Sequence, residues 1–103
     1  MVGRDSAIAV YIMASGRNGT LYVGVTSELE QRVSQHKRGT FDGFSKHYTC
    51  TRLVWFEAFG EMEAAIRRER ALKRWNRDWK LALIESANPD WRDLSDGWWI
   101  ESR

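Results

Sequence analysis

Two stretches near the start of the chain predict a β-hairpin. Residues 7–14 and 20–26 are rich in β-branched and aromatic side chains, and a glycine-containing turn at 15–19 separates them. Side chains that alternate along the chain point to opposite faces of a strand, and in both stretches one face is the more apolar. We therefore expect two antiparallel strands joined by a short turn.

Each predicted strand carries one tyrosine on its less apolar face. Alternation turns Tyr11 away from Val10 and Ile12, and it places Tyr22 on the same face as Gly24. A hairpin that is symmetric about its turn pairs Tyr11 with Tyr22. Because glycine has no side chain, Gly24 is expected to leave the surface beside Tyr22 open to a ligand.

Capping signals and apolar spacing predict the next three elements. A helix is expected to begin at the capping box formed by Ser27 and Glu30 and to end at Gly39. The apolar run at 52–59 predicts a third strand, and acidic residues in the first turn favour a second helix over 61–75.

Two asparagines mark the expected boundaries of the last elements. Asn76 is expected to cap a helix over 77–86 that turns Trp79 and Leu83 inward. The pair Asn88 and Pro89 predicts a further helix start, with asparagine at the cap and proline at the first helical position. Aromatic and aliphatic side chains are expected to dock the tail, namely Leu94, Trp98 and Trp99.

The order β-β-α-β-α-α predicts an α+β domain with a small three-stranded, mainly antiparallel sheet flanked by helices. A length of 103 residues fits a single domain, with a core over about 7–83 and a helical, aromatic tail over 84–103. No apolar run approaches the ~20 residues of a membrane span, and the start of the chain lacks the apolar core of a signal peptide. We therefore expect no membrane partner and a cytoplasmic location. The single cysteine, Cys50, excludes an internal disulfide and a cysteine-rich metal site.

Charge is unevenly distributed, although the net charge is only +2. Between positions 67 and 80 there are seven basic residues and two acidic ones, interleaved with tryptophan. Candidate contacts to nucleic-acid phosphates in this stretch are Arg67, Arg70, Lys73, Arg74 and Arg77. A basic helix of this composition suits DNA or RNA, and a solvated helix surface would have the same composition.

One acid falls where an apolar residue is expected. Glu69 lies on the inner stripe of its predicted helix, between Ile66 and Leu72, and an unpaired carboxylate there is costly. An ion pair with Lys73 or with Arg32 would explain it structurally. Alternatively, this single carboxylate holds Mg²⁺, which commonly takes one or two carboxylates and keeps several waters.

Arg32 and His36 flank the thin apolar stripe of the first predicted helix, which turns both toward the surface that carries the tyrosines. Arginine clamps phosphate bidentately, and a tyrosine phenolate or a histidine can relay a proton to or from water. With a metal at Glu69, these are the parts needed for phosphodiester hydrolysis. Taken singly, each residue also has an ordinary structural role as a packing tyrosine, a structural histidine or a surface arginine.

These residues give the chain a resemblance to the GIY-YIG nuclease superfamily. The triplet Val-Tyr-Ile at 10–12 resembles the first signature and Tyr-Val-Gly at 22–24 the second, with the tyrosines eleven residues apart. Arg32 and His36 follow the second tyrosine by ten and fourteen residues, as in that family, and Glu69 resembles its metal-binding glutamate. The resemblance covers roughly residues 7–83 and is closest to small stand-alone bacterial members, which are similar to the nuclease domain of the DNA excision-repair endonuclease.

The resemblance implies cleavage of DNA with one divalent metal, Mg²⁺ or Mn²⁺. By it, Tyr11 acts as general base or orients the water, with help from His36. Tyr22 hydrogen-bonds to water or phosphate. Arg32 stabilises the charge that develops on the phosphate, and Glu69 holds the metal.

Two other functions stay open on the sequence. One is a nucleic-acid-binding module that keeps the nuclease fold but cleaves little on its own. The other is a structural protein that meets a second copy or a protein partner through the tryptophan-rich tail. The joint presence of a carboxylate and proton-transfer groups favours the endonuclease, because a binding module needs neither.

Overall fold

The structure is a computed structural model that describes residues 7–39 and 49–98, and its centre is a three-stranded sheet. The strands are β1 (Ile8–Ala14), β2 (Leu21–Thr26) and β3 (Arg52–Phe59). Their order across the sheet is β2-β1-β3, and both neighbouring pairs are antiparallel. The α+β prediction with a small antiparallel sheet is therefore confirmed.

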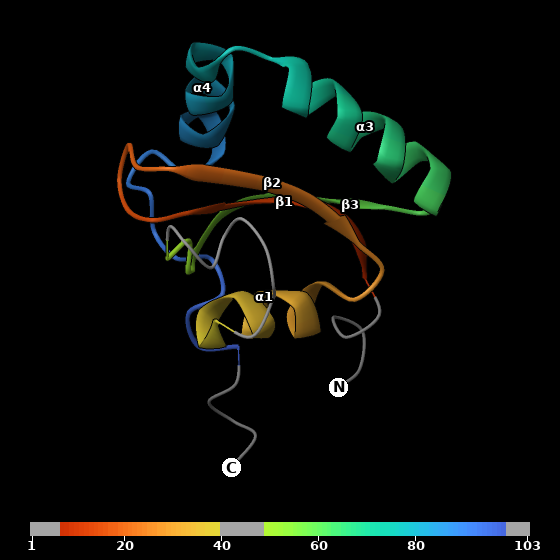
Figure 1. The fold of residues 1–103 in the computed structure, drawn as a ribbon, viewed down its shortest axis with the longest axis horizontal. Helices are drawn as coiled ribbons and strands as arrows, with labels where there is room; N and C mark the ends of the chain where they lie inside the picture. Colours follow the sequence, from red (N-terminus) through yellow and green to blue (C-terminus); the bar gives the residue numbers. More distant parts are fainter. Residues whose placement is uncertain (1–6, 40–48, 99–103) are drawn as a thin grey trace.

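Helices cover both faces of this sheet. α1 (Leu29–Arg38) lies on one side, and α3 (Met62–Arg74) and α4 (Arg77–Ala87) lie on the other (Figure 1). Within residues 7–39 and 49–98, none of the helices combines the length and the apolar character that crossing a membrane requires.

The hairpin register differs from the prediction by two residues. Tyr11 pairs with Gly24, and Tyr22 pairs with Met13. The expected Tyr11–Tyr22 pairing is wrong because the centre of the hairpin lies one residue further along the chain: the Ser15 amide donates to the carbonyl of Thr20 at 3.0 Å. A shift of two preserves the alternation of side chains, so both tyrosines still face the same side.

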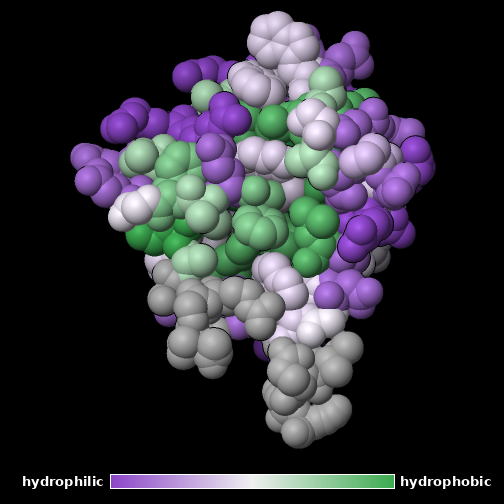
Figure 2. All heavy atoms as spheres, turned by 180° about the vertical axis from the view of Figure 1, so that it is seen from behind, coloured by the Kyte–Doolittle hydropathy of each residue, from purple (hydrophilic) through white to green (hydrophobic). Residues whose placement is uncertain are grey.

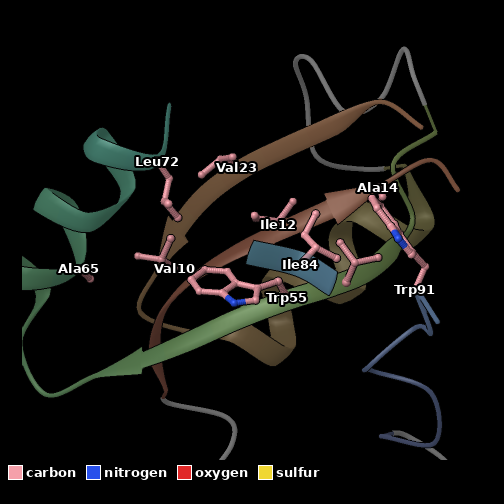
Figure 3. Close-up of a cluster of buried hydrophobic side chains, with 10 residues drawn as sticks. Val10, Ile12, Ala14, Val23, Trp55, Ala65, Leu72, Ile84 and Trp91 are labelled. Carbon is pink, nitrogen blue, oxygen red and sulfur yellow. The ribbon is translucent and has the colours of Figure 1, made fainter. Parts of the chain in front are cut away.

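The side of the sheet under α3 and α4 holds the larger core. Val10, Ile12 and Ala14 of β1 pack there with Trp55 and Trp91 and with apolar side chains of both helices (Figure 3). All three β1 side chains are fully buried, so this layer is dry and apolar. Burial of this kind is the main source of stability in a small domain.

A smaller cluster fills the space between the sheet and α1. Tyr11 and Met13 of β1 pack there against Leu29 and Val33 of α1 and against Cys50. The burial of Cys50 agrees with the sequence, which left it no disulfide partner. The same strand thus supplies both layers, as its two-residue period requires.

The start of α1 also differs from the prediction. The helix begins at Leu29, and the expected capping box of Ser27 and Glu30 is wrong, because the residue at the cap is Glu28 and its side chain makes no capping hydrogen bond. Instead, the hydroxyl of Thr26 accepts a hydrogen bond from the Glu28 amide at 3.0 Å. At the other end, Gly39 adopts the left-handed conformation (φ 71°) expected of a helix-ending glycine.

The cap of α4 is confirmed, and one of the two residues predicted for its inner surface is confirmed. The Asn76 side chain accepts a hydrogen bond from the Trp79 amide at 2.9 Å. Leu83 packs against the core as expected, together with Ile84 and Leu81. The prediction for Trp79 is wrong: it is 58% exposed and meets Trp75 edge to face, with 5.8 Å between ring centroids.

Asn88 does not restart a helix. It is 4% exposed, and its side-chain amide donates to the carbonyls of Val54 at 3.1 Å and Arg92 at 2.9 Å. Its side-chain oxygen accepts from the Arg92 amide, so the side chain closes a turn against β3 and is not available to cap. Among the described residues, the chain after Pro89 runs on in turns.

The segment after α4 docks along β3. The Leu94 amide donates to the carbonyl of Leu53 at 2.8 Å, and Trp98 meets the exposed Phe56 ring at 6.1 Å between centroids. The docking expected of Leu94 and Trp98 is therefore confirmed, and Trp99 lies outside the described residues. Seen from behind, hydrophobic residues gather in the centre of this side of the molecule, with hydrophilic residues at its upper left and its right (Figure 2).

Candidate functional site

The centre of the candidate site is a hydrogen bond between β1 and α1. The hydroxyl oxygen of Tyr11 lies 3.0 Å from Nε2 of His36, and both side chains are buried. Gly24, which pairs with Tyr11 across the hairpin, makes room for the phenol: a Cβ at that position would lie 2.5 Å from its oxygen. Gly24 is buried beneath this ring, so the expectation that it leaves an open surface is wrong.

Tyr22 completes an aromatic cluster around this hydrogen bond. Its ring centroid lies 5.0 Å from that of His36 and 6.3 Å from that of Tyr11. The imidazole meets both phenol rings close to edge on. Because Tyr22 is only half-buried, the cluster reaches the surface along β2, which has a strand neighbour on one side only within the described sheet.

Arg32 and a polar hollow adjoin the cluster at the end of β2. The hollow has a volume of about 230 Å³, and it is lined by Thr26, Ser27, Glu28, Gln31, Arg32 and Gln35. Arg32 is half-buried and lies one helical turn before His36 on α1. Its positive charge acts on both partners of the central hydrogen bond and thus belongs to the same site.

Glu69 enters from α3, on the far side of the sheet. Its side chain is 12% exposed, and its Oε2 lies 2.6 Å from Nζ of Lys73, one turn further along the helix. The ion-pair alternative considered from the sequence is thus present with Lys73 as the partner. The negative charge of Glu69 also acts on Tyr11 and Tyr22, so the carboxylate is electrically part of the cluster.

Burial sets the protonation states of the central pair. Burial raises the pKa of Tyr11 well above its usual range, and the neighbouring Tyr22 raises it further, while the charge and hydrogen bond of Arg32 act the other way. Burial, assisted by the positive charge of Arg32, lowers the pKa of His36 to about 4. At neutral pH the site therefore holds a protonated phenol next to a neutral imidazole.

The donor set at Glu69 fits a hard divalent cation held by one carboxylate. Within residues 7–39 and 49–98, no three His, Cys, Asp or Glu side chains gather around one point. Mg²⁺ is commonly bound by one or two carboxylates, with waters and substrate phosphate completing its shell. Lys73 now holds this carboxylate with a compact positive charge and, at 55% side-chain exposure, has room to leave it.

The basic residues that the sequence proposed for phosphate contacts do not act as one group. Arg67, Arg70 and Arg74 are exposed on α3, as expected for a surface that meets a polyanion. Lys73 is paired with Glu69 inside the candidate site. The guanidinium of Arg77 donates to the carbonyls of Asn18 at 2.8 Å and Gly19 at 2.7 Å, and it thereby ties α4 to the hairpin turn.

Sequence reasoning missed a second set of polar contacts behind the site. Lys37, the residue after His36, forms an ion pair with Asp93 and donates to the carbonyl of Thr51 at 2.9 Å. Asp93 also accepts from the Leu53 amide at 3.3 Å. These contacts fix the end of α1 against β3. The only sequence signal for them is a Lys and an Asp separated by 56 residues, which no spacing rule connects.

Comparison with known proteins identifies the family that this chain matches. Residues 7–82 match the family model of the GIY-YIG catalytic domain, and this span contains all five proposed catalytic residues. A UPF0213 protein of Haloquadratum walsbyi is 36% identical over 76 residues, which cover 74% of this chain and 84% of the relative. A UPF0213 protein of Staphylococcus haemolyticus is 34% identical over 76 residues, covering 74% and 92%.

A solved structure supports the same assignment. The solution NMR structure of a UPF0213 protein from Bacillus halodurans matches with a TM-score of 0.51 and 25% sequence identity, covering 87% of this chain and 95% of that chain. The shared fold, the family match over most of the chain and the relatives above 30% identity lead to one conclusion. This chain belongs to the GIY-YIG catalytic domain family, a nuclease-type family, and is related to its UPF0213 members.

Proposed function

We propose that this protein is a divalent-metal-dependent endonuclease that hydrolyses DNA phosphodiester bonds. The observation that carries the proposal is the buried hydrogen bond of 3.0 Å between Tyr11 and His36, with Arg32 and Glu69 close enough to act on it electrostatically. A proton-transfer pair, a phosphate ligand and a metal ligand are the parts that a one-metal hydrolysis requires. The proposed catalytic residues are Tyr11, Tyr22, Arg32, His36 and Glu69.

The central pair handles the proton of the attacking water. The Tyr11 phenol keeps its proton at neutral pH because burial raises its pKa, so it does not start as a phenolate. The neutral His36 carries a lone pair on one ring nitrogen in either tautomer, and with Nε2 unprotonated it accepts the hydrogen bond from the phenol. Because Tyr11 is buried, water must first reach its hydroxyl; Tyr11 can then take a proton from that water as it passes its own to Nε2 of His36.

Arg32 and Tyr22 bind and orient the phosphate. The planar guanidinium of Arg32 offers a bidentate fork to phosphate oxygens, and its charge offsets the charge that develops there during attack. The Tyr22 hydroxyl supplies one further donor to water or phosphate at the surface of the cluster.

Glu69 is the proposed ligand for Mg²⁺ or Mn²⁺. A divalent cation bound there would supply charge stabilisation for the leaving oxygen and a lowered pKa for a bound water. Glu69 is paired with Lys73, whose Nζ lies 2.6 Å from Oε2, so a cation held by this carboxylate would take the place of the lysine. Either cationic partner would offset the charge of a carboxylate whose side chain is only 12% exposed.

The test is a cleavage assay with labelled single-stranded, duplex, nicked, flapped and four-way DNA, each in Mg²⁺, in Mn²⁺ and in EDTA. We expect metal-dependent cutting by the wild type and none by Glu69→Ala, with DNA affinity equal or slightly tighter because a negative charge is gone. Glu63→Ala is the matched control, since Glu63 is an exposed acid on the same helix. Full cutting by Glu69→Ala would exclude Glu69 as the metal ligand. If the protein binds one of these DNAs in a salt-dependent manner but does not cut it, the result would favour the nucleic-acid-binding module.

A further inference from the structure

A second hollow opens at the beginning of β2, on the α3 and α4 side of the same strand. It has a volume of about 270 Å³, and its walls are Leu21, Tyr22, Val23, Lys73 and Lys80. Tyr22 therefore belongs both to this hollow and to the aromatic cluster around His36. The proposed catalytic residues use Tyr22 but leave the hollow and Lys80 without a role.

The walls of this hollow suit a phosphodiester backbone. They bring together two ammonium groups, one phenol and aliphatic side chains, and they include no acidic residue. The volume is below the ~300–1,000 Å³ usual for whole small-molecule ligands, so a fragment of a longer polymer is the better fit. Ammonium groups bind phosphate as point charges, and the aliphatic floor accepts the apolar edge of a sugar.

Two contacts at the start of α4 fix the position of Lys80. Asn76 caps the helix, and its carbonyl accepts from the Lys80 amide at 3.3 Å. The Arg77 guanidinium holds this first turn on the hairpin tip through Asn18 and Gly19. The turn that carries Lys80 is thus anchored to the hairpin that carries Tyr22, which makes the hollow a built feature of the fold.

The two hollows lie at opposite ends of β2. The one lined by Arg32 adjoins the last residue of the strand, Thr26, and the one lined by Lys80 adjoins its first residue, Leu21. Tyr22 and the buried pair lie between them along the strand. At about 3.3 Å per residue, the six residues of β2 span more than the distance between successive phosphates of one strand. A nucleic-acid strand that places one phosphate at Arg32 and follows β2 would therefore bring a phosphate further along the same strand to the lysines.

We propose that the hollow lined by Leu21, Tyr22, Val23, Lys73 and Lys80 is a subsite for a backbone phosphate more than one position along the strand from the scissile one. Lys80 is its permanent ligand, and Lys73 joins it when Glu69 is released from their ion pair. This inference rests on the proposed nuclease function, because it places the phosphate relative to the bond that is cut. It makes Lys80 a substrate-binding residue of the chain.

The first experiment replaces single phosphates by uncharged methylphosphonates at successive positions on either side of the cut bond. For the wild type, we expect kcat/KM to fall at least about tenfold at one position beyond the adjacent phosphates, the size expected for losing one hydrogen bond to a charged group. Lys80→Ala should lose a similar factor on all-phosphate DNA and then show no further loss with the methylphosphonate. Equal cleavage of every substituted substrate by the wild type, or full sensitivity retained in Lys80→Ala, would overturn the subsite.

The second experiment needs no cleavage and so separates this inference from the nuclease proposal. The affinity of the protein for a labelled DNA duplex in EDTA is measured against salt concentration. Removal of one phosphate ligand in Lys80→Ala should reduce the slope of log affinity against log salt by about 0.9. Arg92→Ala is the control, because Arg92 is an exposed basic residue outside both hollows, and its slope should equal that of the wild type. A Lys80→Ala slope equal to that of the wild type would reject the subsite even if the protein cuts DNA.

Discussion

The strand β1 supplies buried side chains to both faces of the sheet, but only the side chain of Tyr11 contains a polar group that needs a hydrogen-bond partner. On the α3 and α4 side, Val10 and Ile12 are fully buried and need no partner for any polar atom. On the α1 side, Tyr11 is buried as completely, but its hydroxyl requires a partner, and His36 provides it at 3.0 Å. Equal burial thus leaves apolar packing alone on one face and a buried phenol–imidazole hydrogen bond on the other.

The largest effect is expected from Tyr11→Phe, which removes one hydroxyl and keeps the ring. The cleavage rate should fall by about 10²–10⁴-fold, the range typical of a general acid–base group. The free energy of unfolding should fall by only about 1–3 kcal/mol, because Nε2 of His36 loses its buried partner. Single-turnover cleavage and urea unfolding measure the two quantities. A variant that cuts at the wild-type rate would remove Tyr11 from the chemistry.

Ile12→Ala, one position further along β1, should give the opposite pattern. Ile12 is fully buried in the larger core, so the free energy of unfolding should fall by about 2–5 kcal/mol. Cleavage per folded molecule should stay close to that of the wild type under conditions where urea titration shows the variant to be folded. A large loss of activity in folded Ile12→Ala protein would mean that the two faces are not separable.

His36 should make the α1 face sensitive to mild acid. Its pKa is about 4 in the folded protein and 6.5 when unfolded, so the unfolded state binds more protons between these values and stability falls as the pH falls. Between pH 7 and pH 5 the loss should be roughly 2 kcal/mol. Urea unfolding at both pH values measures it, and His36→Gln should remove this contribution. The same pH dependence in His36→Gln would place the titrating group elsewhere.

The smallest effect is expected on the outer surface of α3, which does not pack against the sheet. Replacing Arg70 and Arg74 by alanine should flatten the dependence of log affinity for DNA on log salt, by up to ~0.9 for each phosphate that is no longer bound. Folding should be unaffected, since both residues are exposed. An unchanged slope would remove α3 from the DNA path and leave β2 as the remaining candidate.

The sequence predicted the elements that have strong local signals. β3 spans 52–59 as expected, and Asn76 caps α4, because an apolar run and a capping side chain act over a few residues. The predictions for Ser27 and Asn88 were wrong for different reasons. Near Ser27 a competing local partner is used, because the Thr26 hydroxyl accepts from the Glu28 amide. Asn88 instead bonds Val54 in β3, 34 residues away, and a local pattern does not contain that information.

The candidate site could be predicted from the sequence because its residues match the order and spacing of a known family pattern. Tyr11, Tyr22 and His36 do come together, although the predicted pairing of the tyrosines was wrong by two residues. The error in register did not change the predicted grouping of the tyrosines, because a shift of two residues keeps both rings on the same face of the sheet. The role of Gly24 was misjudged because its neighbour across the hairpin depended on that register. Whether these residues perform catalysis stays a prediction for the assays above.

The segment from Asn88 to Leu94 has a consequence for any shortened version of this protein. β3 is the outer strand on its side of the sheet, and this segment occupies its free backbone groups through the Leu94–Leu53 and Asn88–Val54 hydrogen bonds. A chain trimmed at the end of the family match, at residue 82, would uncover that edge and the core beneath Trp91. Uncovered strand edges pair with other chains. Such a fragment is therefore expected to aggregate, and the smallest stable domain extends past the family boundary.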